Sequence, residues 1–319
     1  MHAMNARQPR VMIGLSVLAL AASLLVGCSG GSGSDDSGGS PGSAITGTLS
    51  GTATKGPVGS ATVKAFAINN GTKGSQLGSA TTDAGGNFTM TMGAYSGPVM
   101  LQVHGGSYLD EATGMRMSML DADQLTCVVP AVTVTAGSTT AGIQVTPLTA
   151  MAQAWAEHMT GGMTAANAML ANSHIGAAYV GPGADIVMMH PIDPTVAGSA
   201  NGASIEAKNY GMILAAMSQS AHDLGMTTSS SAMVTAMSND ASDGIMNGRM
   251  NGTAINMNGM GGMMGGGSMM TTAGTSQLAT SMAAFINNTT MNRSGVTTVA
   301  EMQSLMNQLM QLAASGGQL

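Results

Sequence analysis

Methionine residues in a glycine-rich segment are the side chains of this chain whose type and spacing are best suited to chemistry. Residues 246–270 contain eight methionines and few other apolar groups. Thioether sulfur is a soft ligand that selects Cu(I) over harder ions, and glycine gives a loop the freedom to close around an ion. The segment therefore predicts a site for Cu(I) or Ag(I). The candidate ligands are Met257, Met260, Met263, Met264, Met269 and Met270.

The composition of the whole chain supports a different interpretation of these methionines. The 319 residues include 33 Met, and only 3% are aromatic, so methionine must supply much of the core volume. Such a bias would place methionine in a loop by accident. A generic loop is therefore our first interpretation and a soft-metal site the second. A sink for oxidants is the third, because methionine sulfoxide can be reduced again.

A cysteine ends an N-terminal segment that has the layout of a secretory signal. Arg7 and Arg10 precede an apolar run over residues 11–26, which is too short and too poorly flanked for a spanning helix. Residues 25–28, Leu-Val-Gly-Cys, resemble the bacterial lipobox. The resemblance implies cleavage after residue 27, so that residues 1–27 are the signal peptide, and lipidation of Cys28. A plain signal peptide with an accidental cysteine is the alternative.

The expected lipid anchor would attach the mature chain to a membrane. One acyl chain holds a protein only weakly, whereas the two or more chains of bacterial lipoproteins give stable attachment. Ser29 follows the cysteine where an aspartate would imply retention at the inner membrane, so the outer membrane is expected in a host with two membranes. Residues 28–44 are rich in Gly and Ser and should form a flexible tether with a span of about 20 Å.

Charge excludes one class of partner. Only 8% of the residues are charged. Without Arg7 and Arg10, seven basic residues face fifteen acidic ones, a net charge of −8. Nucleic-acid binding needs a basic patch that releases counterions, and no such patch is present in the sequence. We therefore expect no nucleic-acid partner.

The remaining potential ligands form weaker patterns. His190 follows two methionines and could complete a copper site, although a loop histidine without a partner is the preferred interpretation. Residues 239–248 space Asn and Asp side chains as a Ca²⁺ loop could, but they lack the alternate spacing and the terminal glutamate of a strong one. A helix end followed by a turn explains them more simply.

No pattern in the sequence predicts a reaction. The chain has no Gly-x-Ser-x-Gly, no phosphate-binding glycine loop and no convincing pair of carboxylates. Cys127 lies in an apolar run without basic neighbours, so we expect a buried small hydrophobe rather than a reactive thiol. No disulfide framework is expected. The sequence therefore predicts that the protein is not an enzyme.

Short alternating segments predict strands in residues 45–145. They cover residues 61–68, 77–82, 88–92, 98–103 and 126–134, separated by turn residues, as in a β-sandwich. Residues 55–63 (Lys-Gly-Pro-Val-Gly-Ser-Ala-Thr-Val) and 80–88 (Ala-Thr-Thr-Asp-Ala-Gly-Gly-Asn-Phe) resemble the carboxypeptidase-regulatory-like, or prealbumin-like, sandwich. The resemblance implies an antiparallel fold and a non-catalytic accessory module without active-site residues to carry over.

Helical spacing replaces this alternation from residue 146 onward. Thr146 and Pro147 predict an N-cap and a first helical position. Further helices are expected over residues 164–175, 205–224, 231–243, 277–286 and 299–314. Because the strands come first and the helices follow, we expect the α+β class, with a β-sandwich domain at 45–145 and a helical domain at 146–319.

Two functional hypotheses follow from the sequence. The first is a lipid-anchored envelope lipoprotein with a non-catalytic binding, adhesion or structural role and an unidentified protein or glycan partner. The second is a lipoprotein that binds Cu(I) or Ag(I) outside the cytoplasm through the methionine-rich loop at 246–270.

Overall fold

The structure is a computed structural model in which residues 46–226, 230–257 and 267–319 are described. The longer strands, β1 to β9, precede the helices along the chain, which confirms the α+β class. The strands are β1 (Thr46–Ala53), β2 (Thr62–Asn69), β3 (Thr72–Thr81), β4 (Asn87–Gly93), β5 (Tyr95–His104), β6 (Ser107–Leu109), β7 (Arg116–Ser118), β8 (Leu125–Val134), β9 (Thr139–Val145), β10 (Arg249–Met250) and β11 (Thr253–Ala254). The helices are α1 (Pro147–His158), α2 (Ala165–Tyr179), α3 (Ile205–Asp223), α4 (Ser231–Ala241), α5 (Ser276–Asn287) and α6 (Gln303–Ala314), with a 3-10 turn, η1, at Val299–Met302.

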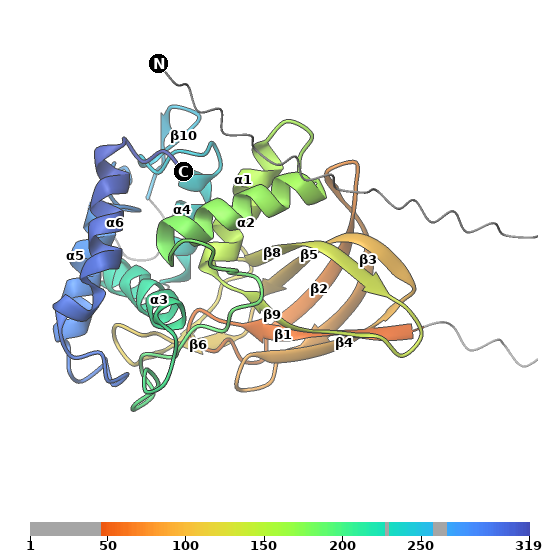
Figure 1. Ribbon diagram of the computed structural model, residues 1–319, viewed down its shortest axis with the longest axis horizontal. Coiled ribbons are helices and arrows are strands. Elements are labelled where there is room, and N and C mark those ends of the chain that lie inside the picture. The colour runs from red at the N-terminus through yellow and green to blue at the C-terminus, as the bar shows by residue number, and fades with distance from the viewer. Residues whose placement is uncertain (1–45, 227–229, 258–266) are drawn as a thin grey trace, which may run out of the picture. The chain divides into compact units, whose positions relative to one another are not determined.

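Two sheets make up most of the strand-rich part (Figure 1). One is antiparallel, with the strand order β3-β2-β5-β8, and the other has the order β4-β1-β9. In the second sheet β1 is antiparallel to β4, with Leu49 opposite Met90, but parallel to β9. The parallel pair departs from the expected antiparallel arrangement. It forms because the chain crosses from one sheet to the other between β8 and β9.

The strands with clear alternation are the ones that the sequence predicts. The segments expected at 61–68, 77–82, 88–92, 98–103 and 126–134 correspond to β2, β3, β4, β5 and β8. β1 and β9 are not predicted, because their sequences, TGTLSGTA and TTAGIQV, contain few large apolar residues. β1 lies between two partner strands, β4 and β9. Hydrogen bonds to both strands therefore stabilise it in the sheet, although its sequence has a weak preference for the strand conformation.

Side-chain caps set the start of several helices. The N–H of Thr146 donates to the hydroxyl oxygen of Thr149 at 2.8 Å, and the N–H of Thr149 donates to the hydroxyl oxygen of Thr146 at 3.3 Å. This reciprocal pair confirms the N-cap predicted at Thr146. The helices expected further along the chain correspond to α2 to α6. α3 differs from the single apolar face expected for it. It is buried continuously from Asn209 to Ala221, because neighbouring elements cover it on several sides.

Buried apolar residues of the strands and the helices belong to the same core. β8 packs against α1 and α2, α3 packs against α5, and α5 packs against α6. Val145 at the end of β9 and Leu148 in α1 are both fully buried. The described residues form one compact unit, and position 146 marks the change from strand to helix within it. A division into domains at 45–145 and 146–319 stays a prediction.

The turn between β2 and β3 contacts the turn between α1 and α2. Gly71 has φ +76°, and its carbonyl accepts the N–H of Met163 at 2.7 Å. A Cβ at Gly71 would lie 1.7 Å from the carbonyl oxygen of Gly161. Glycine is therefore required by both the backbone conformation and the close approach. This contact helps to fix the sheet to the helices.

We expect Gly71→Ala to lower the free energy of unfolding by about 2 kcal/mol, because the methyl group adds strain at a positive φ and a backbone clash. Urea unfolding followed by circular dichroism measures the change. Gly93→Ala is the matched control, since a Cβ there meets nothing within 4 Å, and it should change stability by less than about 0.5 kcal/mol. Equal stability of the two variants would contradict the role of the Gly71 contact.

Candidate functional site

Six polar side chains meet in the interior, where connections of the strand-rich part reach α3 and α4. Each is at most 2% exposed, although charged groups are seldom fully buried unless they are paired. We call this set the buried charge cluster. Its members are Lys55, Tyr108, Asp110, Glu111, Ser218 and Ser230.

A close backbone contact brings the lysine to the carboxylates. Lys55 follows β1, and Gly56 after it has φ +60°. A Cβ at Gly56 would lie 2.1 Å from the carbonyl oxygen of Leu109, the last residue of β6. Asp110 and Glu111 come directly after Leu109. Two turns that are far apart in the sequence are therefore in contact through Gly56 and Leu109. This contact brings the adjacent charged residues together.

Two serines complete the cluster from the helical part. Ser218 lies in the last third of α3, and its hydroxyl donates to Glu111 Oε2 at 2.5 Å. Ser230 precedes α4, and its hydroxyl donates to Asp110 Oδ2 at 2.5 Å. One carboxylate is thus held by a hydroxyl group from α3 and the other by a hydroxyl group from the residue before α4. The hydrogen bonds join the strand-rich part of the chain to α3 and α4.

The ammonium group of Lys55 lies at the centre. Its Nζ donates to Glu111 Oε2 at 3.2 Å, to Ser230 Oγ at 3.2 Å and to Ser218 Oγ. Asp110 Oδ2 is 3.9 Å from the same nitrogen. The three donor positions of the ammonium therefore have acceptors, and two carboxylates surround one positive charge.

Burial and charge act in opposite directions on these groups. Burial alone lowers the pKa of Lys55, but the charges of Glu111 and Asp110 outweigh it and raise that pKa above its ordinary value. Burial raises the pKa of Glu111, and the nearby charge of Asp110 adds to this effect. The Tyr108 ring, whose centroid is 5.2 Å from Lys55 Nζ, also favours the cation. Before any proton is transferred within the cluster, these partners favour the ammonium form of Lys55.

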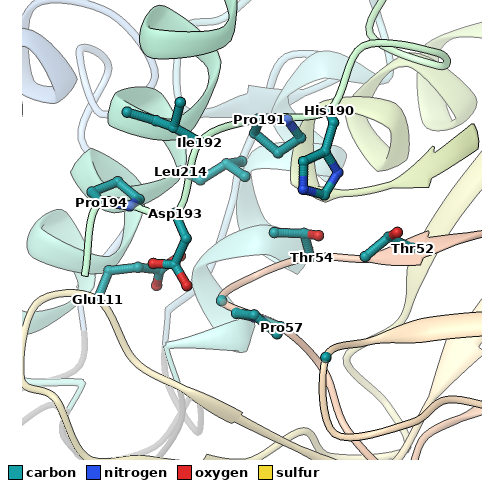
Figure 2. Close-up of a pocket in the computed structure, with 12 residues that line it drawn as sticks. Thr52, Thr54, Pro57, Glu111, His190, Pro191, Ile192, Asp193, Pro194 and Leu214 are labelled. Carbon is teal, nitrogen blue, oxygen red and sulfur yellow. The ribbon is translucent and has the colours of Figure 1, made fainter. Parts of the chain in front are cut away.

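A small pocket adjoins the cluster on the side of Glu111. Figure 2 shows His190 and Thr54 on one side of it and Glu111 and Asp193 on the other. Its volume of about 60 Å³ is enough for a few water molecules, which need roughly 10–15 Å³ each by this measure, but not for an organic substrate. The pocket can therefore serve as a water site beside the Glu111 carboxylate.

A larger hollow lies elsewhere on the surface, with a volume of about 460 Å³. Its walls come from β8, α2 and residues 183–188. Met169 and Met188 line it and are about half exposed, at 60% and 47%. Its size and apolar lining fit the apolar part of a ligand or partner better than a charged group.

The predicted soft-metal ligands are only partly within the described residues. Met260, Met263 and Met264 lie outside them. Met257 and Met269 are buried, at 1% and 5% exposure, and belong to the hydrophobic core, whereas Met270 is 42% exposed. The N–H of Met257 donates to the carbonyl oxygen of Gly267 at 3.0 Å, so these two residues of the methionine-rich loop are adjacent. The soft-metal site stays a prediction.

Other candidate residues of the sequence have structural partners. Cys28 lies outside the described residues, together with the rest of residues 1–45. Cys127 is a buried free thiol, as predicted, and burial raises its pKa to about 12. His190 Nδ1 lies 3.1 Å from Gln144 Oε1, so the expectation of a histidine without a partner is wrong. No helix within 46–226, 230–257 or 267–319 is both long and apolar enough to cross a bilayer.

Asp240, in the segment considered for Ca²⁺, organises a turn. Its Oδ1 accepts the N–H groups of Asn247, Gly248 and Arg249 at 2.9, 2.7 and 3.1 Å. Its Oδ2 is buried and has no hydrogen-bond partner among the described residues. The described part of the chain contains no group of three or more His, Cys, Asp or Glu suited to a metal ion. These contacts fit the simpler interpretation, a helix end followed by a turn.

Comparisons with known proteins do not assign a family. No family model matches this chain. No curated protein matches it either. Among solved structures, a crystal structure of a 9R-lipoxygenase from Cyanothece is similar with 12% identity and a TM-score of 0.21. The similarity covers 66% of this chain and 26% of the lipoxygenase.

One expectation from the sequence is corrected here. The prediction that the chain is not an enzyme is withdrawn, and the similar solved structure named above is that of an enzyme. The missing motifs behind that prediction are the common ones, and their absence does not exclude a reaction built from other residues. A TM-score of 0.21 transfers no lipoxygenase activity, substrate or active-site residue to this chain.

The buried charge cluster is the site that the sequence does not reveal. Lys55 precedes a Gly-Pro turn, and Asp110 and Glu111 precede the turn ending at Gly114, so each looks like an ordinary surface turn residue. One signal is present. In a chain with only 8% charged residues, an adjacent acidic pair directly after the apolar strand residues Tyr108 and Leu109 is unusual. That signal does not reveal that the acidic pair contacts Lys55, which is 55 positions earlier in the sequence.

We expect Lys55→Met to destabilise the fold by about 3–5 kcal/mol, because it leaves two buried carboxylates without their cation. Chemical denaturation of the variant beside the wild type measures this loss. Lys64→Met on β2, where the side chain is partly exposed, serves as the control and should cost less than about 0.5 kcal/mol. If the two lysine variants unfold at the same urea concentration, the buried charge cluster does not contribute to stability as we expect.

Asp240 should make stability depend on pH. Burial raises its pKa from 3.8 to about 6, so the folded state binds the proton more tightly than the unfolded chain. Stability should therefore increase as the pH falls from 7 through 6 towards 4, by up to about 3 kcal/mol relative to Asp240→Asn. Unfolding curves at several pH values measure this difference.

Asp83 provides a control of opposite sign for Asp240. The side-chain hydrogen bond from Asn87 lowers its pKa, so its contribution to stability is lost at acidic pH. The free energy of unfolding of Asp83→Asn should therefore lie closer to that of the wild type at low pH than at neutral pH.

If the free energies of unfolding of the wild type and Asp240→Asn change with pH in the same way, the role assigned to Asp240 is refuted.

Proposed function

We propose that this protein is a lipid-anchored lipoprotein of the bacterial envelope that displays residues 46–319 for binding, adhesion or structural support. The observation that carries the proposal is Cys28, directly after an apolar run with two arginines in front of it. Residues 28–44 would act as the tether, and the outer membrane is the expected location. The partner would be a protein or a glycan, and nucleic acid is not expected.

We further propose that residues 45–145 are a prealbumin-like sandwich and that the helices from residue 146 onward form a second domain. Support comes from two sheets whose buried residues share a core. Support also comes from the turn at residues 82–88, where Asp83 Oδ1 accepts the N–H groups of Gly85 and Asn87 and Gly86 has φ +80°. The resemblance places a glycine with a positive φ in this hairpin.

The hollow between β8, α2 and residues 183–188 supports a binding role. Its volume of about 460 Å³ and its half-exposed methionines offer apolar surface that a partner can cover. Methionine side chains adapt to partners of different shape because they are unbranched and flexible. We therefore propose this hollow as the contact region for the partner.

Lipidation at Cys28 gives a direct test. In cells supplied with a labelled fatty acid, the wild type should incorporate the label, and Cys28→Ser should lose it, because the thiol that carries the lipid is absent. Cys127→Ala is the matched control and should retain the label, since Cys127 is buried. Label in Cys28→Ser at the wild-type level, or an unmodified Cys28 in the N-terminal peptide of the mature wild type, would overturn the proposal.

A further inference from the structure

The arrangement around Lys55 has the components needed to form an amide bond. A primary amine with no exposure to solvent lies beside two carboxyl groups, 3.2 Å from Glu111 Oε2 and 3.9 Å from Asp110 Oδ2. Reactants held this close are already oriented, which removes much of the entropic barrier to a reaction between them. A buried site also excludes the water that would compete for the carboxyl carbon.

We propose that Lys55 and Asp110 condense spontaneously into an intramolecular isopeptide bond, with Glu111 as the proton acceptor. The bond that forms joins Lys55 Nζ to Asp110 Cγ, and the bond that breaks joins Cγ to Oδ2. One water molecule is released. No oxidant, reductant or cofactor takes part, because the reaction is a condensation of an amine with a carboxylic acid.

Hydrogen bonds on both oxygens prepare Asp110 for attack. Its Oδ1 accepts the N–H and the hydroxyl of Thr113 at 3.0 and 2.8 Å, so donors already face the oxygen on which negative charge develops. Its Oδ2 accepts the hydroxyl of Ser230 at 2.5 Å. The two oxygens therefore have distinct roles, in which Oδ1 becomes the oxyanion and Oδ2 becomes the leaving oxygen.

The same contacts provide a route for each proton. Lys55 Nζ donates to Ser230 Oγ, which donates to Asp110 Oδ2, so one ammonium proton can pass through this hydroxyl and leave a neutral amine facing a carboxylic acid. After attack, Glu111 Oε2 at 3.2 Å takes the second proton and passes it to the departing oxygen. Glu111 ends ionised as it began, and the third proton stays on the amide nitrogen.

Glu111 has the environment of a base in this step. Burial raises its pKa, which makes the carboxylate a stronger proton acceptor than an exposed one. It also lines the small pocket in Figure 2, whose volume of about 60 Å³ has room for the released water.

The bond is tested by digesting the purified full-length protein and weighing its peptides. We expect a branched peptide that joins the segments containing Lys55 and Asp110, with the mass of both segments minus one water. Fragmentation should place the branch at these two residues. Recovery of both segments as separate, unmodified peptides in full yield would overturn the proposal, and this result does not depend on any variant.

Two conservative variants test the roles of the carboxyl groups. Asp110→Asn should give a branched peptide of the same mass as the wild type, because the amide loses ammonia where the acid loses water. Glu111→Gln should reduce the linked fraction strongly, since a positioned base contributes roughly 10²- to 10⁴-fold to such a step. A linked peptide that is unchanged in Glu111→Gln, or one branched at residue 111, would contradict these assignments.

Discussion

The buried amino group of Lys55 must keep its polar partners, and the contact between the strand-rich part and α3 and α4 depends on that requirement. Lys55 has no exposure, and the partners that balance it come from separate parts of the chain. The carboxylates of Asp110 and Glu111 belong to the strand-rich part, whereas the hydroxyls of Ser218 and Ser230 belong to the helical part. Moving either part away would leave buried polar groups of the cluster without partners, which costs more than losing an apolar contact.

The change from strand to helix at residue 146 does not coincide with a gap in the core. Thr146 caps α1 and lies 2.6 Å from the hydroxyl of Tyr210 in α3, while β8 packs directly against α1 and α2. Polar and apolar contacts thus cross the boundary at several places.

Local patterns in the sequence were sufficient for elements whose residues alternate or recur strongly, such as β2, β4 and α1. They were insufficient for β1, whose small residues are held by a partner strand on each side, and for β9, an edge strand that pairs with β1. The buried charge cluster could not be predicted, because Lys55 and Glu111 look like ordinary turn residues until the fold brings the turns together. Whether a charge is buried is a property of the tertiary structure, and only the scarcity of charge hinted at it.

The parallel pairing of β1 with β9 has a mechanical consequence. β1 is the first described strand, and it lies between β4 and β9 in its sheet. Tension applied to the chain ahead of Thr46 would therefore pull this strand along its own axis and load both hydrogen-bonded ladders at once, in shear. An edge strand would instead peel away one bond at a time. If the protein were held at its N-terminal end in a flowing medium, the hydrogen bonds of this central strand would bear the force of the drag.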